Sequence, residues 1–166
     1  MSRRHEVFRA ALDDSYAIHI KDALLKAIFN AGDIPLPQGV LQERSLARYH
    51  ESWGREGDFG FAAVLGDCGA VVGICWCRLL SGDNRGYGYV DDATPELSIA
   101  VWESFRERGI GSMLLDKTIE EAISRGYGGL SLSVQRGNRS VNLYERKGFK
   151  TIDRVDDAYT MYLDLR

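Results

Sequence analysis

Two glycines at the start of a predicted helix carry the clearest chemical signal in this chain. The run Val101–Ser112 leads from a short apolar strand into a loop, and Gly109 and Gly111 then open an amphipathic helix. The first N–H groups of a helix lack backbone partners and lie at the positive end of the helix dipole, so they attract anions. Glycine lets phosphate oxygens approach the backbone, and Arg106 and Arg108 add positive charge. The pattern predicts a pyrophosphate site, and a helix that starts with glycines for close packing is the structural alternative.

Two common nucleotide-binding motifs do not fit this run. A Rossmann fingerprint requires a third glycine where Leu114 stands, and a P-loop requires a Gly-Lys-Ser/Thr sequence that does not follow here. The phosphate site must therefore belong to another kind of fold.

Three side chains near this run could take part in proton transfer or hydrogen bonding. Glu96 begins the strand that leads into the glycines, and a carboxylate with a raised pKa can take a proton from an amine. Tyr144 lies in a predicted short helix and has one phenolic proton to donate. Asn138 precedes that helix and can cap it. Each has a simpler alternative: a solvated strand end for Glu96, core packing for Tyr144, and capping alone for Asn138.

Two blocks of residues follow the predicted strand. The first is Arg106-x-x-Gly109-x-Gly111, and the second consists of Asn138, Leu143-Tyr144 and Gly148-Phe149. Together they resemble the coenzyme-A-binding signature of the GNAT acetyltransferase superfamily, and the resemblance covers about residues 93–153. Glu107 stands where the family often has a small residue, and Trp102-Glu103 replaces its usual His-Pro, but neither change removes a backbone amide.

The resemblance implies a role for each block. The strand Glu96–Val101 would pair with the pantetheine arm, with an amide near Ile99 polarising the thioester carbonyl, and Asn138 would bind the arm. Glu96 would be the base, directly or through water, and Tyr144 would protonate the departing thiolate. The residues implied in cofactor binding are Ile99, Ala100, Val101, Arg106, Glu107, Arg108, Gly109, Ile110, Gly111, Ser112 and Asn138.

The function implied by this resemblance is transfer of the acetyl group of acetyl-CoA to a primary amine, directly within a ternary complex. The acceptor, a small molecule or a peptide amine, cannot be read from the sequence, and a preference for another acyl-CoA stays open. The alternative is a non-catalytic acyl-CoA-sensing or partner-binding module with the same fold. The presence of both Glu96 and Tyr144 favours the enzyme.

The elements that must position these residues follow from hydrophobic periodicity and turn signals. They predict an α/β chain, and the resemblance implies a single-domain GNAT-like fold with a mixed, mostly antiparallel sheet of about six to seven strands and about four helices. The expected strands are Glu6–Leu12, Phe59–Leu65, Ala70–Leu80, Glu96–Val101, Leu130–Val134, Phe149–Asp153 and Tyr159–Leu165. The expected helices are Tyr16–Asn30, Leu41–Trp53, Gly109–Arg125, with a buried stripe of Gly111, Leu115, Ile119 and Ala122, and Arg139–Lys147.

Composition limits the remaining possibilities. The 166 residues suit one domain, residues 1–166, and the net charge of −3 gives no indication of nucleic-acid binding. Three cysteines argue against a disulfide framework, and Cys75 and Cys77 fit small buried side chains better than a metal site or a catalytic thiol. We expect no metal. The sequence has no signal peptide and no membrane-length apolar run, which predicts a cytoplasmic protein. The oligomeric state stays open, with a homodimer possible.

Overall fold

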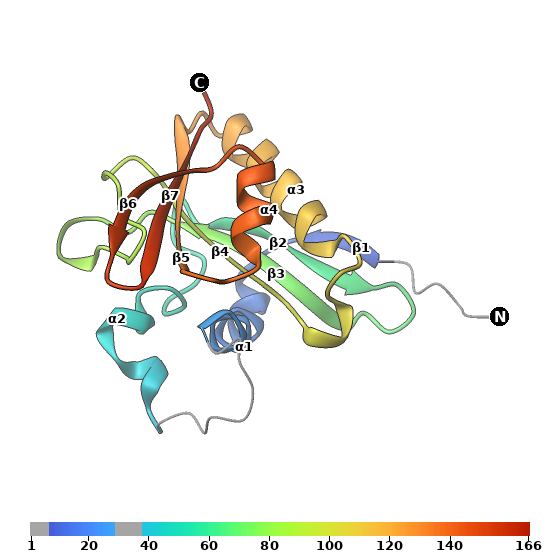
Figure 1. Cartoon of the computed structure of the whole chain (residues 1–166). Helices are drawn as coiled ribbons and strands as arrows, with labels where there is room; N and C mark the ends of the chain where they lie inside the picture. Colours follow the sequence, from blue (N-terminus) through green and yellow to red (C-terminus); the bar gives the residue numbers. More distant parts are fainter. Residues whose placement is uncertain (1–6, 29–37) are drawn as a thin grey trace.

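A seven-stranded sheet forms the middle layer of the protein. The computed structural model describes residues 7–28 and 38–166, and it places the strands in the order β1-β2-β3-β4-β5-β7-β6 (Figure 1). All neighbouring strands are antiparallel except β4 and β5, which are parallel. The strands are β1 Val7–Ala11, β2 Phe59–Leu65, β3 Val71–Arg78, β4 Glu96–Val101, β5 Gly129–Gln135, β6 Lys150–Val155 and β7 Ala158–Asp164. The expected mixed, mostly antiparallel sheet is confirmed.

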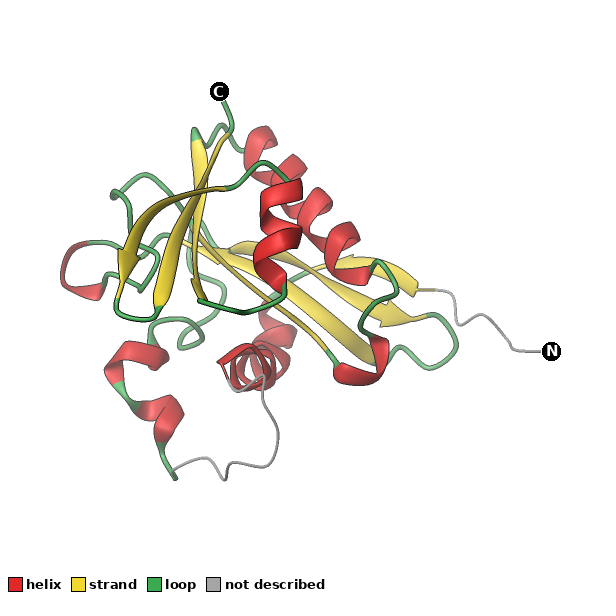
Figure 2. Cartoon of the chain, in the orientation of Figure 1, coloured by secondary structure: helices red, strands yellow, loops and turns green. Residues whose placement is uncertain are grey.

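Within the described residues, four α-helices cover the two faces of this sheet, and both helical layers are visible in Figure 2. One face carries α3 (Ile110–Ser124) and α4 (Ser140–Arg146), and the other carries α1 (Ala17–Ile28) and α2 (Arg44–Ala47) (Figure 1). The predicted helices Gly109–Arg125 and Arg139–Lys147 are confirmed as α3 and α4, and each end lies within one residue of its predicted position. Glu6, the first residue of the expected strand Glu6–Leu12, lies outside the described residues. So does Asn30, the last residue of the expected helix Tyr16–Asn30.

The predicted helix Leu41–Trp53 is wrong as one element. The chain forms a short 3-10 turn, then the four residues of α2, then successive turns to Gly54. The backbone leaves the helical region at Glu43 (φ −59°, ψ 132°), before α2, and again at Ser52 (φ 50°). The guanidinium of Arg78 donates to the carbonyls of Arg48 (3.1 Å), Glu51 (2.7 Å) and Ser52 (3.1 Å). The side chains of Leu46, Tyr49 and Trp53 in this segment are all buried.

The core divides into two clusters, one on each face of the sheet. The cluster under α3 and α4 includes Cys75 and Cys77, which are fully buried, as the sequence predicts. In the predicted stripe of α3, which Met113 and Leu114 were expected to broaden, Leu114, Leu115 and Ala122 are buried, whereas Gly111, Met113 and Ile119 are only half-buried. The buried residues of α3 are Ile110, Leu114, Leu115, Thr118 and Ala122. The cluster under α1 and α2 contains Tyr49, Ile74, Trp76 and Ala100 among others.

Within residues 7–28 and 38–166, none of the helices has the length and apolar character to cross a bilayer.

Candidate active site

Strands β4 and β5 run together at one end and then separate. They share one ladder pair, Glu96 with Ser131, closed by a hydrogen bond of 3.1 Å from the Ser131 N–H to the Pro95 carbonyl. On its other side, β4 pairs with β3 along its whole length. Beyond the shared pair, no described residue of β5 is paired with Ile99 or Val101. This edge of β4 is therefore open to an extended ligand.

The direction of the open amides follows from the ladder. Alternate residues of an antiparallel strand bond the same neighbour. The N–H of Trp102 bonds Val72 of β3 at 2.9 Å, so the even-numbered residues of β4 bond β3. The N–H of Ile99 therefore points toward the gap between β4 and β5. The amide expected near a thioester carbonyl has the orientation that this role requires.

The N-terminus of α3 opens beside the end of β4. The first helical hydrogen bond runs from the Met113 N–H to the Gly109 carbonyl (3.0 Å), so the amides of Ile110, Gly111 and Ser112 precede it. Gly109 has φ of 79°, and a Cβ there would meet nothing within 4 Å. Its role is conformational, and the space beside it is open. These features fit a bound pyrophosphate group.

Gly111 has a different environment from Gly109. A Cβ at Gly111 would lie 3.5 Å from Leu143 Cδ2 and 3.7 Å from Val101 Cγ2, so it would face α4 and the end of β4. Both distances are ordinary contacts that a methyl group would satisfy, whereas a larger side chain would be crowded. Close packing, the structural alternative, therefore accounts for Gly111.

The loop before α3 is held by its own charged side chains. Arg106 Nε donates to the Val101 carbonyl at 3.1 Å, and the Arg108 guanidinium lies 5.3 Å from the centre of the Phe105 ring. Glu107 has φ of 58°, a left-handed conformation that favours glycine. This explains why a small residue suits the position. The Glu107 carboxylate forms a solvent-exposed ion pair of 3.4 Å with Arg139.

Glu96 is buried, with only 4% of its surface exposed. Its Oε1 accepts hydrogen bonds from the Tyr49 hydroxyl (2.6 Å) and the Gly88 N–H (2.9 Å), while Oε2 has no hydrogen-bond partner among the described residues. Burial raises the pKa of this carboxyl, and the two hydrogen bonds and the charge of Arg48 oppose the shift. This burial excludes the alternative in which Glu96 is only a solvated strand end. A buried carboxylate with a raised pKa is suited to act as a base.

Tyr49 joins this carboxylate to the loop 81–95, and sequence analysis did not identify it as a functional residue. Its hydroxyl also accepts a hydrogen bond of 2.7 Å from the Tyr87 N–H, and the two rings stack at 6.4 Å. Burial, followed by the charge of Glu96, raises the pKa of Tyr49, so the phenol stays protonated.

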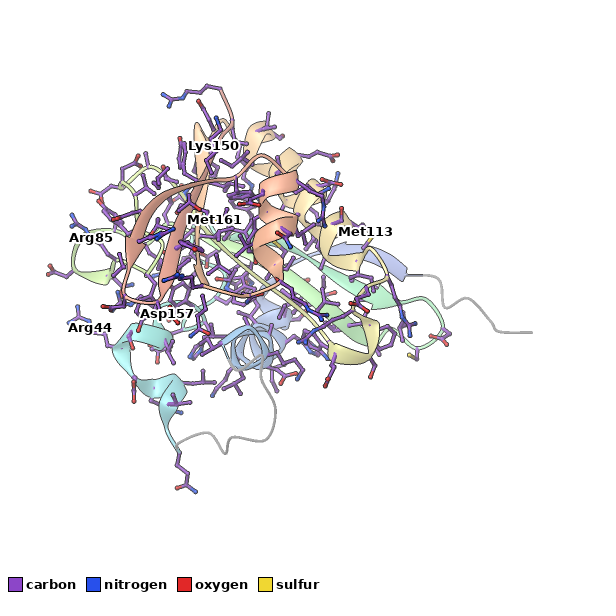
Figure 3. The ribbon with its side chains drawn as sticks, viewed as in Figure 1. Arg44, Arg85, Met113, Lys150, Asp157 and Met161 are labelled. Carbon is purple, nitrogen blue, oxygen red and sulfur yellow. The ribbon has the colours of Figure 1, made fainter. Side chains whose placement is uncertain are left out.

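The loop 81–95 lies directly over the carboxylate. A Cβ at Gly86 would overlap Glu96 Oε2, so only glycine allows this approach. Arg44 of α2 donates to the Asp83 carbonyl at 3.3 Å and joins the loop to the helix. Arg44 and Arg85 lie on the same side of the molecule, where α2 and the loop meet (Figure 3).

Tyr144 is buried in the cluster under α3 and α4. Its ring packs edge-on against Phe149, with centroids 5.9 Å apart. Burial, and next the neighbouring Cys75 thiol, raise the pKa of the phenol, while the side chain of Ser140 opposes the shift. The hydroxyl therefore keeps its proton at neutral pH. Both the proton-donor role and the packing role are compatible with this position.

Asn138 caps α4, as its sequence position predicts. Its Oδ1 accepts a hydrogen bond of 2.9 Å from the Ser140 N–H. The carboxamide NH₂ group is a donor, and capping does not use it.

Comparisons with known proteins agree with this geometry. Searching the curated proteins finds no match. Among solved structures, an acetyltransferase of the GNAT family from Staphylococcus aureus Mu50 is 18% identical, covers 97% of this chain and 100% of its own, and has a TM-score of 0.70. The YncA protein from Salmonella typhimurium, solved with its cofactor acetyl-CoA, is 21% identical, with 97% and 95% covered and a TM-score of 0.71. The ribosomal-protein-S18-alanine N-acetyltransferase from Escherichia coli is 19% identical, with 96% and 94% covered and a TM-score of 0.63.

These structural similarities establish the fold, and a sequence match establishes the family. The sequence model of the acetyltransferase (GNAT) family matches residues 25–149, which are 125 of the 166 residues. The match includes the open edge of β4, the N-terminus of α3, Glu96 and Tyr144. This chain is therefore a member of the acetyltransferase (GNAT) family.

Proposed function

We propose that this protein is an acetyl-CoA-dependent N-acetyltransferase that acetylates a primary amine by direct transfer in a ternary complex. The observation that carries the proposal is the open edge of β4, which lies between the N-terminus of α3 and the buried carboxylate of Glu96. Residues 1–166 would form one acetyltransferase domain.

The residues at the open edge suit acetyl-CoA in charge and shape. The amides of Ile110–Ser112, with Arg106 and Arg108 nearby, would hold the pyrophosphate. The Ile99 N–H would polarise the thioester carbonyl, and the Asn138 NH₂ group would bind the pantetheine arm. When bound, acetyl-CoA supplies an acyl group on a thiol leaving group. The acetyl-CoA in the Salmonella structure supports this choice of cosubstrate.

Proton movement would be the task of the two buried side chains. An amine such as that of lysine has a pKa near about 10, so it must lose a proton before or during attack. Glu96 would take that proton as the new C–N bond forms. Tyr144 would give its proton to sulfur as the C–S bond breaks. The raised pKa of Glu96 supports its assignment as the base, whereas the raised pKa of Tyr144 shows only that its phenol holds its proton at neutral pH.

Four segments surround the place where the acceptor would bind. They are α1, α2, the loop 81–95 and the β6–β7 turn. The E. coli structure, by its name, acts on an alanine of a ribosomal protein, so a peptide amino terminus belongs among the acceptors to be tested. Polyamines, amino acids and aminoglycosides belong there too.

The test is an acceptor panel assayed with acetyl-CoA. Spermidine, lysine, kanamycin and a peptide with a free amino-terminal alanine would be incubated with the protein, and thiol release and acetylated products would be measured, the latter by mass spectrometry. We expect amine-stimulated thiol release and a product heavier by one acetyl group. Binding of acetyl-CoA in calorimetry without release by any amine would instead support the acyl-CoA-sensing module.

A further inference from the structure

A pocket opens between the segment 44–55 and the loop 81–95. Its volume is about 310 Å³, at the lower end of the range for small-molecule sites. Its lining holds three arginines against one glutamate, so the pocket is locally positive although the whole protein has a net charge of −3. The polar lining residues are Arg44, Arg48, Glu51, Ser52, Arg55 and Asn84.

The three arginines of this pocket have no acidic partner. Across residues 7–28 and 38–166, no ion pair involves Arg44, Arg48 or Arg55. Glu51 lines the same pocket, and its carboxylate pairs with none of them. A guanidinium group is always charged and binds carboxylates and phosphates through two parallel hydrogen bonds. The pocket is therefore suited to an anion.

Two of these arginines are held in place by hydrogen bonds that leave donors free. Arg48 Nε donates to the Arg44 carbonyl at 3.0 Å, and Arg44 Nη2 donates to the Asp83 carbonyl at 3.3 Å. In the part of the chain that the structure describes, no acceptor is bonded to either Nη group of Arg48. These two terminal nitrogens can bind both oxygens of one carboxylate or phosphate group.

Backbone oxygens do not neutralise this charge. The three carbonyls that Arg78 bonds belong to residues of the pocket lining, so they are occupied by another cation. Partial burial, and next the charge of Arg78, lower the pKa of the Arg55 guanidinium, whereas Asp58 opposes this shift. A bound anion would offset the repulsion between the two guanidinium groups.

The pocket adjoins the elements that hold the candidate base. Tyr49 follows Arg48 in the chain, and its hydroxyl donates to Glu96 at 2.6 Å. Asn84 belongs to the loop whose Gly86 packs against Glu96 Oε2. Burial raises the pKa of Glu96, and the charge of Arg48 is among the effects that oppose this shift, so the guanidinium is within electrostatic reach of the carboxylate. A group bound in the pocket would be close to the place where an acceptor amine loses its proton.

The pocket is separate from the candidate pyrophosphate site. The arginines beside that site, Arg106 and Arg108, precede α3, which covers the other face of the sheet (Figure 1). Arg44 instead lies on α2, next to the loop 81–95 (Figure 3). The phosphates of the cosubstrate would bind at α3, so the anion at α2 would belong to another molecule.

We propose that this pocket binds an anionic group of the acceptor, and that the protein therefore acetylates small amines that carry a carboxylate or a phosphate group. The inference rests on the proposed function. The anion would accept hydrogen bonds from Arg48 and Arg55, with Arg44 adding charge, while the amine extends toward Glu96. The separation of anion and amine in the preferred acceptor would then match the distance from the pocket to the base.

The test uses pairs of amines that differ in the charge of one distant group. γ-Aminobutyrate and ε-aminocaproate would each be compared with its amide, and phosphoethanolamine with ethanolamine, all with acetyl-CoA. In the parent we expect kcat/KM to be at least about tenfold higher for the anionic member of one or more pairs. The carboxylate pairs and the phosphate pair show which kind of anion the pocket accepts.

Arginine variants then locate the origin of this preference. Arg48→Gln combined with Arg55→Gln should bring the ratio of kcat/KM between anion and neutral partner to about one. Arg48→Lys keeps the charge without the planar fork, so its ratio should be intermediate. Arg85→Gln removes a positive charge from the same loop outside the pocket lining and should keep the parent ratio. A general loss of activity, including any effect of Arg48 on the pKa of Glu96, cancels in the ratio.

Direct binding distinguishes this inference from the proposed function. In an NMR titration, inorganic phosphate should shift the amide signals of residues 44–55 and of Asn84 saturably in the parent and not in the combined variant. Equal acetylation of both members of every pair would overturn the inference and leave the proposed function standing. Acetylation of no amine, with phosphate bound at these residues, would overturn the proposed function and the acceptor assignment and keep an anion site. If the combined variant fails to fold, an unchanged ratio in both single variants overturns the inference.

Discussion

The side chains of Glu96 and Tyr144 lie on opposite faces of the sheet. Glu96 bonds Tyr49 of the cluster under α1 and α2, whereas Tyr144 is buried in the cluster under α3 and α4. In the proposed reaction, the proton is removed from the amine on one face and delivered to sulfur on the other. The two groups therefore never need to exchange a proton with each other.

Replacing Glu96 with glutamine should remove the base and retain most of the shape of the side chain. Because burial raises the pKa of Glu96, the acidic limb of the parent profile should lie above the ordinary range for glutamate. In Glu96→Gln, kcat/KM should fall by roughly 10²-fold near neutral pH and recover partly at high pH, where free amine is abundant. The measurement is the pH–rate profile with the amine panel. A profile identical to that of the parent would mean that another group is the base.

The same substitution should change the dependence of stability on pH. The pKa of Glu96 is higher in the folded state than in the unfolded state, so the folded state binds this proton more tightly. The stabilisation is fully present below the unfolded pKa, about 4.3, and is lost as pH rises through the folded pKa. Glu96→Gln should therefore gain stability relative to the parent between pH 4 and neutral pH. Urea unfolding at several pH values measures this difference, and a constant difference would contradict the expectation.

Removing the hydroxyl of Tyr144 should separate catalysis from packing. Tyr144→Phe should lower kcat by roughly 10²-fold, because the leaving thiolate loses its proton donor, while the Kd for acetyl-CoA stays unchanged. A packing role would give the reverse, a stability loss of about 1 kcal/mol with normal turnover. Single-turnover rates and thermal unfolding of the same variant distinguish these results. Phe149→Leu, which alters the ring contact and leaves the hydroxyl, is the matched control.

Two substitutions at Glu107 should distinguish backbone strain from charge. Glu107→Gly relieves the left-handed conformation at φ 58° and should stabilise the protein by up to about 1 kcal/mol, after the entropy cost of glycine. Glu107→Gln keeps the strain and removes the charge, so its stability should equal that of the parent. Both should bind acetyl-CoA about two- to threefold more tightly at low salt, because a negative charge beside the phosphates is lost. Calorimetry at two salt concentrations tests this, and weaker binding by the glutamine variant would argue against phosphates at this loop.

Loss of Arg78 should destabilise the segment 44–58. Its guanidinium bonds Asp58 at 3.0 and 2.7 Å and three carbonyls, and both partners of the ion pair are buried. Arg78→Met leaves the Asp58 carboxylate without its charge partner and should cost about 3–5 kcal/mol. Lys117→Met, which breaks the exposed pair with Glu120, should cost less than about 1 kcal/mol. Similar losses in the two variants under denaturant unfolding would contradict this account.

Elements whose periodicity is local could be predicted from the sequence. Strand Glu96–Val101 has the predicted bounds, because alternating apolar residues define a strand without reference to the rest of the chain. The helix Leu41–Trp53 failed because its backbone leaves the helical region at Glu43 (ψ 132°) and at Ser52 (φ 50°). Neither departure follows from the hydrophobic periodicity of the segment.

The contacts within the candidate site could not be predicted in this way. Tyr49 and Glu96 are 47 residues apart in sequence, and only the packing of α2 over the sheet brings them together. The sequence around Tyr49 does not indicate that its hydroxyl meets a carboxylate. Ser131 alternates with leucines along β5, which shows only that it faces away from them.

The double hydrogen bond of the Tyr49 hydroxyl has a consequence for the evolution and engineering of this enzyme. One oxygen atom links the Glu96 carboxylate to the backbone of the loop 81–95, a segment that would also border the proposed acceptor. Remodelling that loop to admit a new amine would therefore disturb the orientation of the carboxylate at the same time. In the proposed enzyme, selectivity and turnover would thus be coupled, and a transplanted loop would succeed only if it restored a donor in place of the Tyr87 amide.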